Sequence, residues 1–462
     1  MMKKTKEDIL KNIFKKEQEL DLYSFKVLEA PVWYLLRFTV RVSKLNKEIG
    51  YVNRTSKIKL RLGRMFYSYI KSFIQFIGII LGTKNKPYLV LAFPRLVNYK
   101  GKYIDKFTDP LILQTNLKNK TLVLQRNLSG EQFVPRYKDV DAVYKTSDFI
   151  DYSSKILALI LFPIIFVYYF KKIDRLYRRA SSYFDLSNNF KLLISFKIGE
   201  FLIHYFFAKK ILKKLKTKKI FLVNRMIFLP FIVAAKKEKI TVFELQHGIT
   251  HSETELYIGT YEKKIDPDFF LTFGEKWKGE QFSIPLSKQV NIGWAYNSWL
   301  LNANKSQIKS KSVLIVSSPA ITDNILKTTI ALAKKYKEYY FNIRLHPQEE
   351  LSLKQEDLLE NYNNISLDNK TKDSLNSILE SEYIIGENSS VLYEALSLDK
   401  PVGKIMFNGL HSKAKLDDQF EGITYLLNVN GFNELIKSKN KKRQTSGIYD
   451  IFEVEKFNNL LE

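Results

Sequence analysis

The chain has 462 residues, 45% of them hydrophobic and 14% aromatic, which is enough for two to three domains with buried cores. It contains no cysteine, which excludes a disulfide framework, a zinc–thiolate site and a cysteine nucleophile. Its 74 basic and 48 acidic residues give a net charge of +26, so we expect an anionic partner: nucleic acid, anionic lipid headgroups or a phosphorylated substrate.

Residues 1–85 are basic and amphipathic, and they predict a helical N-terminal region without a recognisable active-site residue. The first residues contain no apolar signal core, so export is not expected. Residues 67–81 predict an apolar helix followed by a basic stretch. The strand predicted at 88–93 then opens a first α/β domain, 86–297.

Residues 156–170 are an unbroken apolar run inside this domain, flanked by Lys155, Lys171 and Lys172. As a helix the run would extend about 22 Å, short of the ~30 Å hydrocarbon core of a bilayer, and Pro163 would kink it. We therefore expect 67–81 and 156–170 to lie at an anionic membrane surface, with the protein cytoplasmic and peripheral to the inner face of the cell membrane. A buried core helix and a true span are the alternatives.

Two basic runs, 209–219 and 437–443, raise the question of nucleic acid. Neither is interleaved with aromatic residues as in a single-strand-binding platform, and no zinc-finger or RNA-recognition pattern occurs. The sequence therefore predicts no nucleic-acid partner.

Strand and helix patterns alternate from residue 220 onward, which indicates parallel sheets with crossover helices. A polar stretch, 298–311, breaks the pattern and predicts a linker. A second α/β domain follows at 312–425, and 426–462 predicts a helical, basic C-terminal tail. The fold class we expect is α/β, with two doubly wound domains in tandem and a cleft between them.

Polar side chains follow three of the predicted strands, where open α/β sheets bind their ligands. The first strand end carries Gln246, His247 and Gly248. We interpret His247 as the general base for an incoming hydroxyl, since imidazole titrates near the operating pH, and place Gln246, Gly248 and His251 on the acceptor side. Glycine at 248 would let a substrate approach closely.

The other two strand ends predict a site for a donor phosphate. Ser389 and Ser390 begin the helix predicted at 391–398, where hydroxyl groups, main-chain N–H groups and the helix dipole favour an anion. His346 would bind the phosphate or protonate the leaving group. The remaining donor-side candidates are Arg344, on the same strand face as His346, with Glu387, Asn388, Ser317 and Ser318.

Structural alternatives remain for these residues. Ser389 and Ser390 would serve as an ordinary helix cap, with Glu394 as a favourable charge in the first turn, and His346 would cap the next helix. No metal site is expected, because the aspartate pairs at 139/141 and 266/268 do not follow strands and the histidines lack ligand spacing.

Three segments, 244–248, 344–347 and 386–396, resemble GT-B glycosyltransferases of bacterial capsule, lipopolysaccharide and teichoic-acid synthesis. The His-Pro and Ser-Ser motifs are similar to those of enzymes that use CMP-activated sugars. His-Gly combined with Arg-X-His-Pro is also similar to CDP-polyol phosphotransferases. The resemblance implies two Rossmann-like domains around a central cleft and a nucleotide-sugar substrate, with CMP-linked sugars as one candidate, and no bound cofactor.

The leading hypothesis is a metal-independent glycosyltransferase that binds its donor in the second domain and a glycan or lipid-linked acceptor in the first. A CDP-polyol phosphotransferase on the same fold is the first alternative, and a sugar epimerase, which would need no membrane segments, is the second. The non-enzyme alternative is a basic membrane- or nucleic-acid-binding protein.

Overall fold

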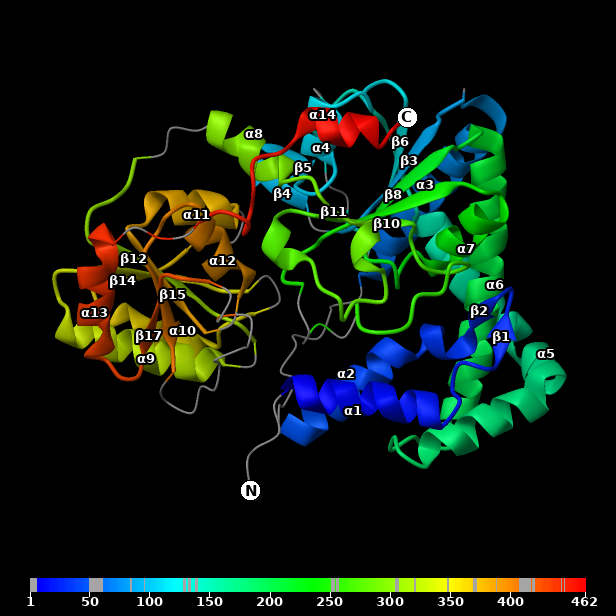
Figure 1. The fold of residues 1–462 in the computed structure, drawn as a ribbon, viewed down its shortest axis with the longest axis horizontal. Coiled ribbons are helices and arrows are strands. Elements are labelled where there is room, and N and C mark those ends of the chain that lie inside the picture. Colours follow the sequence, from blue (N-terminus) through cyan, green and yellow to red (C-terminus); the bar gives the residue numbers. More distant parts are fainter. Residues whose placement is uncertain are drawn as a thin grey trace.

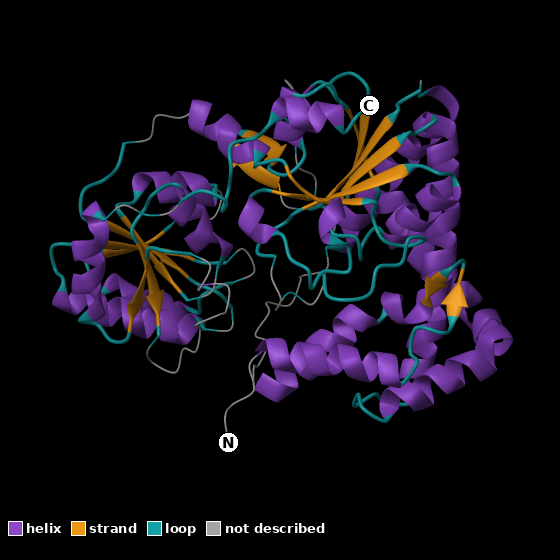
Figure 2. Ribbon diagram, viewed as in Figure 1, coloured by secondary structure: helices purple, strands orange, loops and turns teal. Residues whose placement is uncertain are grey.

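Two α/β lobes and a helical part make up the protein in the computed structural model (Figure 1). The structure describes the whole chain except residues 1–5, 50–60, 84, 95, 128–129, 132–133, 138–139, 251–253, 255–256, 304–306, 320, 347–348, 369–371, 388, 407–416, 418–419, 442 and 444. Figure 2 shows a separate fan of strands in each lobe, covered by helices.

The first sheet has seven parallel strands in the order β11-β10-β9-β8-β3-β6-β7. Their bounds are β3 (Tyr88–Ala92), β6 (Thr121–Gln125), β7 (Val143–Thr146), β8 (Lys219–Val223), β9 (Thr241–Leu245), β10 (Phe269–Thr272) and β11 (Gln289–Asn291). The strand order reverses between β3 and β8, and such a switch point opens a crevice at the carboxyl ends of the strands.

The second sheet has six parallel strands in the order β14-β13-β12-β15-β16-β17. Their bounds are β12 (Ser312–Val316), β13 (Tyr340–Arg344), β14 (Ile365–Leu367), β15 (Tyr383–Gly386), β16 (Val402–Ile405) and β17 (Ile423–Leu426). The order reverses between β12 and β15, so Ser317 and Glu387 follow the two strands that flank this switch point.

Helices cover both sheets, because the strands are apolar on both faces. The first domain carries α4 (Asp109–Gln114), α7 (Leu229–Lys237), α8 (Ala295–Ala303), η3 (Glu275–Trp277), η4 (Leu286–Lys288) and the hairpin β4 (Leu96–Tyr99) with β5 (Lys102–Asp105). The second carries α9 (Thr322–Lys335), α10 (Leu353–Glu360), α11 (Ser374–Glu380), α12 (Ser390–Ser397), α13 (Gly431–Lys437) and η6 (Ser438–Asn440).

The N-terminal part is mainly helical, with α1 (Lys6–Glu19), η1 (Val32–Leu35), α2 (Arg37–Ile49), α3 (Leu62–Gly82) and a short hairpin of β1 (Lys26–Val27) and β2 (Ala30–Pro31). Residues of α1, η1 and α2 share a core with two long helices, α5 (Asp148–Ser181) and α6 (Phe190–Leu215). The apolar run 156–170 is thus the middle of a 34-residue helix that continues through Pro163. The helix is therefore longer than the apolar run alone had predicted.

Two of the described helices, α3 and α5, are long and apolar enough to cross a membrane by length and composition. Only 22% and 17% of their most apolar stretches are buried inside the protein. Large exposed side chains such as Phe66 and Ile74 on α3, and Ile160 and Val167 on α5, form an apolar surface. A buried core helix, the alternative for the run 156–170, therefore does not explain why most of these side chains are exposed.

The chain returns to the first domain at its C-terminal end, where α14 (Val454–Asn459) lies above α4 in Figure 1. Phe457 packs against Phe221 of β8, and Lys219 donates to the carbonyl of Leu460. Gly293, with φ +73°, leaves room for the main chain of Ile451, which an added Cβ would strike. The tail expected at 426–462 thus contains elements of both domains.

The predicted fold class is confirmed, because the chain forms two α/β domains with parallel sheets. The domain boundaries stay a prediction. Further features differ from the expectation. Helix α8 extends over the first part of the predicted linker 298–311, and the strands β1, β2, β4, β5, β6, β7 and β17 were not anticipated.

Candidate active site

A pocket lies between the two domains at the carboxyl edges of their sheets. Its empty volume is about 280 Å³, part of it open to solvent. It is lined by Lys106, Phe107, Gly248, Phe273, Trp294, Ser390, Glu394 and Tyr449. The pocket therefore combines loops of the first domain, the start of α12 in the second and the returning C-terminal segment.

His247 directly precedes one of these lining residues and is partly exposed. Its Nδ1 lies 3.1 Å from the Tyr257 hydroxyl, and its ring centroid lies 5.8 Å from that of Phe93. Burial raises the pKa of Tyr257 well above its ordinary value, so the phenol stays neutral. When the imidazole donates from Nδ1 to the phenol oxygen, the lone pair of Nε2 is left for a substrate hydroxyl.

The turn around His247 is held by Gln246, whose side chain is buried. Its Oε1 accepts from the N–H of Phe273 at 2.8 Å, and its Nε2 donates to the carbonyl of Gly248 at 2.8 Å. Gly248 has φ +100°, a backbone conformation that favours glycine, and open space adjoins it. Gln246 thus positions the turn, while its contact with an acceptor stays a prediction; His251 lies outside the described residues.

The N-terminus of α12 reaches the same pocket. Ser389 is the N-cap, and its Oγ accepts from the N–H of Val391 at 3.3 Å, whereas Ser390 lines the pocket. Both expected roles are therefore compatible here, one serine capping the helix and the next bordering an anion-favouring space. Glu387 is buried close by in sequence, and Asn388 lies outside the described residues.

A buried carboxylate that the sequence analysis missed organises the loop after β13. Glu349 accepts from the Ser317 hydroxyl at 2.7 Å, from the Thr322 hydroxyl at 2.5 Å and from the main-chain N–H of His346 at 2.6 Å. Ser318 begins the turn into α9, since its carbonyl accepts from Ile321. The position of Glu349, three residues after His346, was the feature of the sequence that could have indicated this contact. Ser317 and His346 are thereby held together at neighbouring strand ends.

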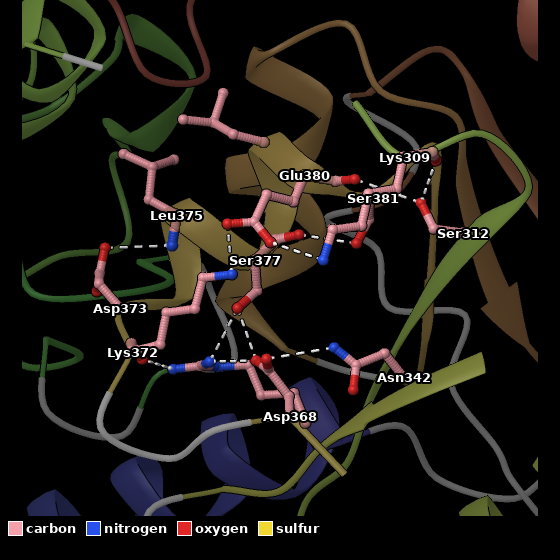
Figure 3. A network of polar contacts seen from close by, with 12 residues as sticks. Lys309, Ser312, Asn342, Asp368, Lys372, Asp373, Leu375, Ser377, Glu380 and Ser381 are labelled. Atoms are coloured by element: carbon pink, nitrogen blue, oxygen red, sulfur yellow. Dashed lines mark hydrogen bonds and ion pairs between the residues drawn. The ribbon is translucent and has the colours of Figure 1, made fainter. Parts of the chain in front are cut away.

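Arg344 has its hydrogen-bonding partners within the second domain. Figure 3 shows three of these partners, Asp368, Lys372 and Ser377. The NH1 of Arg344 lies 2.5 Å from Asp368 and 3.1 Å from the Ser377 hydroxyl, and its NH2 donates to the carbonyl of Lys372 at 2.6 Å. This ion pair is largely buried, so breaking it would leave a charge uncompensated. Arg344 ties β13 to α11, and its predicted contact with a donor phosphate stays a prediction.

The pocket contains an ion pair between the domains that the sequence did not reveal. Lys106 Nζ lies 3.9 Å from Glu394 Oε1, and Lys106 also lies over the Trp294 ring. Glu394 is buried, and this burial raises the pKa of its carboxyl while Lys106 opposes the shift. Glu394 is the fifth residue of α12, beyond the first turn in which the sequence analysis placed it.

Two buried carboxylates hold the loop that carries Lys106. Asp105 Oδ1 accepts from the N–H groups of Phe107 and Thr108, and Asp109 accepts from the N–H of Asp105 at 2.8 Å. Asp109 is also paired with Arg136 at 2.7 Å. Burial, reinforced by the charge of Asp109, raises the pKa of Asp105 to about 7.

This shift predicts a dependence of stability on pH. Between about pH 4 and about pH 7 native Asp105 keeps a proton that the unfolded chain has lost, so the free energy of unfolding should fall as pH rises through that window. Asp105→Asn should match the wild type at about pH 4 and exceed it by up to a few kcal/mol at about pH 8, measured by urea unfolding. Asp357→Asn, at an exposed position, is the control. An equal effect of Asp105→Asn at both pH values would contradict the assignment.

The structure thus brings Gly248 and Ser390, from the two domains, into one pocket, with His247 and Ser389 beside them in sequence. Of the described residues, no three histidine or acidic side chains are grouped so that they could hold a metal ion. Metal independence stays a prediction.

No family model matches the chain, and no curated protein matches it. Among solved structures, it is similar to the UDP-GlcNAc 2-epimerase from Methanocaldococcus jannaschii, with 14% identity and a TM-score of 0.49 over 82% of this chain and 99% of that one. It is also similar to S. aureus MnaA in a structure with UDP, with 12% identity and a TM-score of 0.47 over 81% and 96% of the two chains.

A third similar structure is the wall teichoic acid polymerase TagF soaked with CDPG. The identity is 12% and the TM-score 0.45, over 88% of this chain and 98% of that one. These identities and scores are low, so the proposals below rest on the residues of this chain.

Proposed function

We propose that this chain is a glycosyltransferase that moves a sugar from a nucleotide-activated donor to a glycan or lipid-linked acceptor. The observation that carries the proposal is the pocket between the domains, where Ser390 at the start of α12 and Gly248 beside His247 are lining residues. An anion-favouring helix start thus lines the pocket, and the imidazole belongs to the residue that precedes the lining Gly248.

On the donor side, the reaction needs positive potential where the nucleotide leaves as a phosphate anion. Ser390, the main-chain N–H groups at the start of α12 and Lys106 supply hydrogen-bond donors and charge there. His346, which Glu349 holds through the main chain, is our second donor-side candidate. We place the nucleotide against the second domain on these grounds.

On the acceptor side, His247 would take the proton of the attacking hydroxyl. The acceptor oxygen then bonds to the anomeric carbon as the bond from that carbon to the donor phosphate breaks, and the nucleotide leaves with the bonding electrons. Tyr257 holds the imidazole through Nδ1, which fixes the ring for this transfer. A CDP-polyol phosphotransferase would use the same groups, with attack on phosphorus.

A thermal-shift panel of CMP, CDP, UDP, GDP and dTDP tests the proposal, since a ligand that binds only the native state raises the melting temperature. We expect at least one nucleotide to do so. A shift by CDP with turnover of CDP-polyols would select the phosphotransferase, and conversion of a UDP-sugar without an acceptor would select the epimerase. No shift with any nucleotide would contradict a nucleotide-dependent enzyme.

We also propose that α3 and α5 attach the protein peripherally to the inner face of the cell membrane, next to a lipid-linked acceptor. Supporting this are their exposed apolar side chains and the lysines at the ends of the apolar run, Lys155, Lys171 and Lys172. Such a surface is unfavourable in water but stable at the boundary between headgroups and acyl chains.

Neutralising these lysines should weaken binding to anionic vesicles. Replacing Lys155, Lys171 and Lys172 with glutamine should cost roughly 1 kcal/mol per residue in a vesicle sedimentation assay at low salt. Replacing Lys327, Lys334 and Lys337 of the second domain with glutamine removes equal charge and should have a smaller effect. A wild-type protein that remains in the supernatant as a monodisperse species would contradict membrane attachment.

A further inference from the structure

A second pocket lies in the first domain, at the carboxyl ends of β6 and β7 and against α3. Its empty volume is about 510 Å³, part of it open to solvent, larger than that of the pocket between the domains. The residues that matter for its chemistry are Lys71, Gln125, Asn127, Arg136, Tyr144 and Lys145. The proposed glycosyl transfer uses none of these residues.

This pocket is positively charged. Lys71, Arg136 and Lys145 border it, and Arg136 is paired with the carboxylate of Asp109. Lys145 has no ion pair with any described residue. The Nε of Arg136 is buried and has no hydrogen-bond partner in the described part of the chain. Lys145 therefore presents a positive charge without an ion-pair partner to an anion in the pocket.

One wall of the pocket is built by an apolar, exposed helix. Gln75 of α3 accepts from the N–H of Thr146 at 2.7 Å, and Ser72 donates to the carbonyl of Thr146 at 2.8 Å, which fixes α3 to the end of β7. On the same helix, Ile70 and Ile74 are 40% and 65% exposed. The basic pocket and an apolar surface therefore share α3, and α3 contacts α5, which also exposes large apolar side chains.

The pocket is also connected to the proposed catalytic base. Gln125 Nε2, on the pocket wall, donates to the carbonyl of Phe93 at 3.2 Å, and the Phe93 ring packs against His247. Both residues follow or end strands of the same parallel sheet, at the same edge. Gln125 and Phe93 thus form a chain of contacts from the pocket wall to His247.

We propose that this pocket binds the terminal phosphate group of an acceptor lipid whose hydrocarbon chain lies along the exposed faces of α3 and α5. The acceptor role rests on the proposed function. Binding of a lipid phosphate does not rest on the proposed function, because it is inferred from a cationic pocket that borders an apolar surface. Charge complementarity selects the phosphate, and the adjoining apolar side chains select a lipid over a soluble phosphate.

The test compares vesicles of phosphatidylcholine that contain phosphatidic acid with vesicles that contain phosphatidylglycerol, adjusted to equal surface charge. Phosphatidic acid presents a terminal phosphate, whereas glycerol covers that of phosphatidylglycerol. We expect the wild type to prefer phosphatidic acid by about tenfold or more, as charge-assisted hydrogen bonds are strong. Lys71→Ala with Lys145→Ala should abolish this preference, and Lys145→Ala alone should reduce it.

The matched control is Lys171→Ala with Lys172→Ala, which removes the same charge from the end of the apolar run. It should weaken binding to both kinds of vesicle and keep the preference for phosphatidic acid. An unchanged preference in the pocket variants would overturn the proposal, as would competition by free glycerol phosphate at the affinity of the lipid. Nucleotide thermal shifts, measured on the same variants, check folding and separately test the proposed function.

Discussion

Replacing His247 with alanine is expected to lower turnover by about 10²–10⁴-fold while nucleotide binding stays nearly unchanged, as for the loss of a general base. The structure supports a separation of the two effects, because His247 follows a strand of the first domain whereas the helix start that favours the phosphate belongs to the second. The measurements are the initial rate of sugar transfer and the nucleotide-induced thermal shift of wild type and variant.

His346→Ala is the companion variant, since it should impair donor binding as well as the rate. Tyr257→Phe is the control for orientation: it removes the hydroxyl on Nδ1, so we expect a smaller loss of rate and a shift in the pH–rate profile. Full activity in both histidine variants would end the catalytic interpretation of both motifs. Loss of nucleotide binding in His247→Ala alone would place the donor in the first domain.

The strands that carry the candidate site were predictable because their signals are local. Short, mainly apolar segments followed by polar turns predict strands at 240–245, 341–345 and 383–385. The observed strands β9, β13 and β15 lie within one residue of these bounds. The parallel sheets followed from the alternation of strands and helices. The order of the strands did not follow, since it depends on packing between distant elements.

The contacts across the pocket could not be predicted from the sequence, because they join residues that are far apart in the chain. Lys106 and Glu394 lie 288 positions apart (394 minus 106), and nothing near either residue marks the other as its partner. Tyr449 reaches the pocket because the chain crosses back to the first domain after η6. Such pairs become visible once the two sheets are placed side by side.

Arg344 illustrates the converse limit. The alternation of a strand predicted that Arg344 shares a face with His346, and its charge suggested a phosphate ligand. Asp368, which follows β14, and Ser377, on α11, bind its guanidinium in the structure. Strand alternation therefore predicts the face of the strand on which a side chain lies. The partner of that side chain depends on elements that follow later in the chain.

The second large effect is expected for the two serines of α12, where the structure separates their roles. Ser389→Ala with Ser390→Ala should weaken nucleotide binding by about 3–6 kcal/mol at most, the value for two hydrogen bonds to a charged group, and by less where main-chain donors compensate. Because Ser389 caps the helix, its replacement should also cost about 1 kcal/mol of stability. Ser390, which lines the pocket, should affect binding alone.

Single variants distinguish these contributions. Ser390→Ala should lower nucleotide affinity, measured by titration calorimetry, at unchanged stability toward urea. Ser389→Asn keeps a favourable N-cap residue, so it should retain the stability that Ser389→Ala loses. If a folded double variant binds nucleotide as the wild type does, the serines are only a helix cap and the donor phosphate lies elsewhere. If instead Ser390→Ala alone removes most of the affinity, the start of α12 is the phosphate site, and Lys106 across the pocket becomes the next residue to replace.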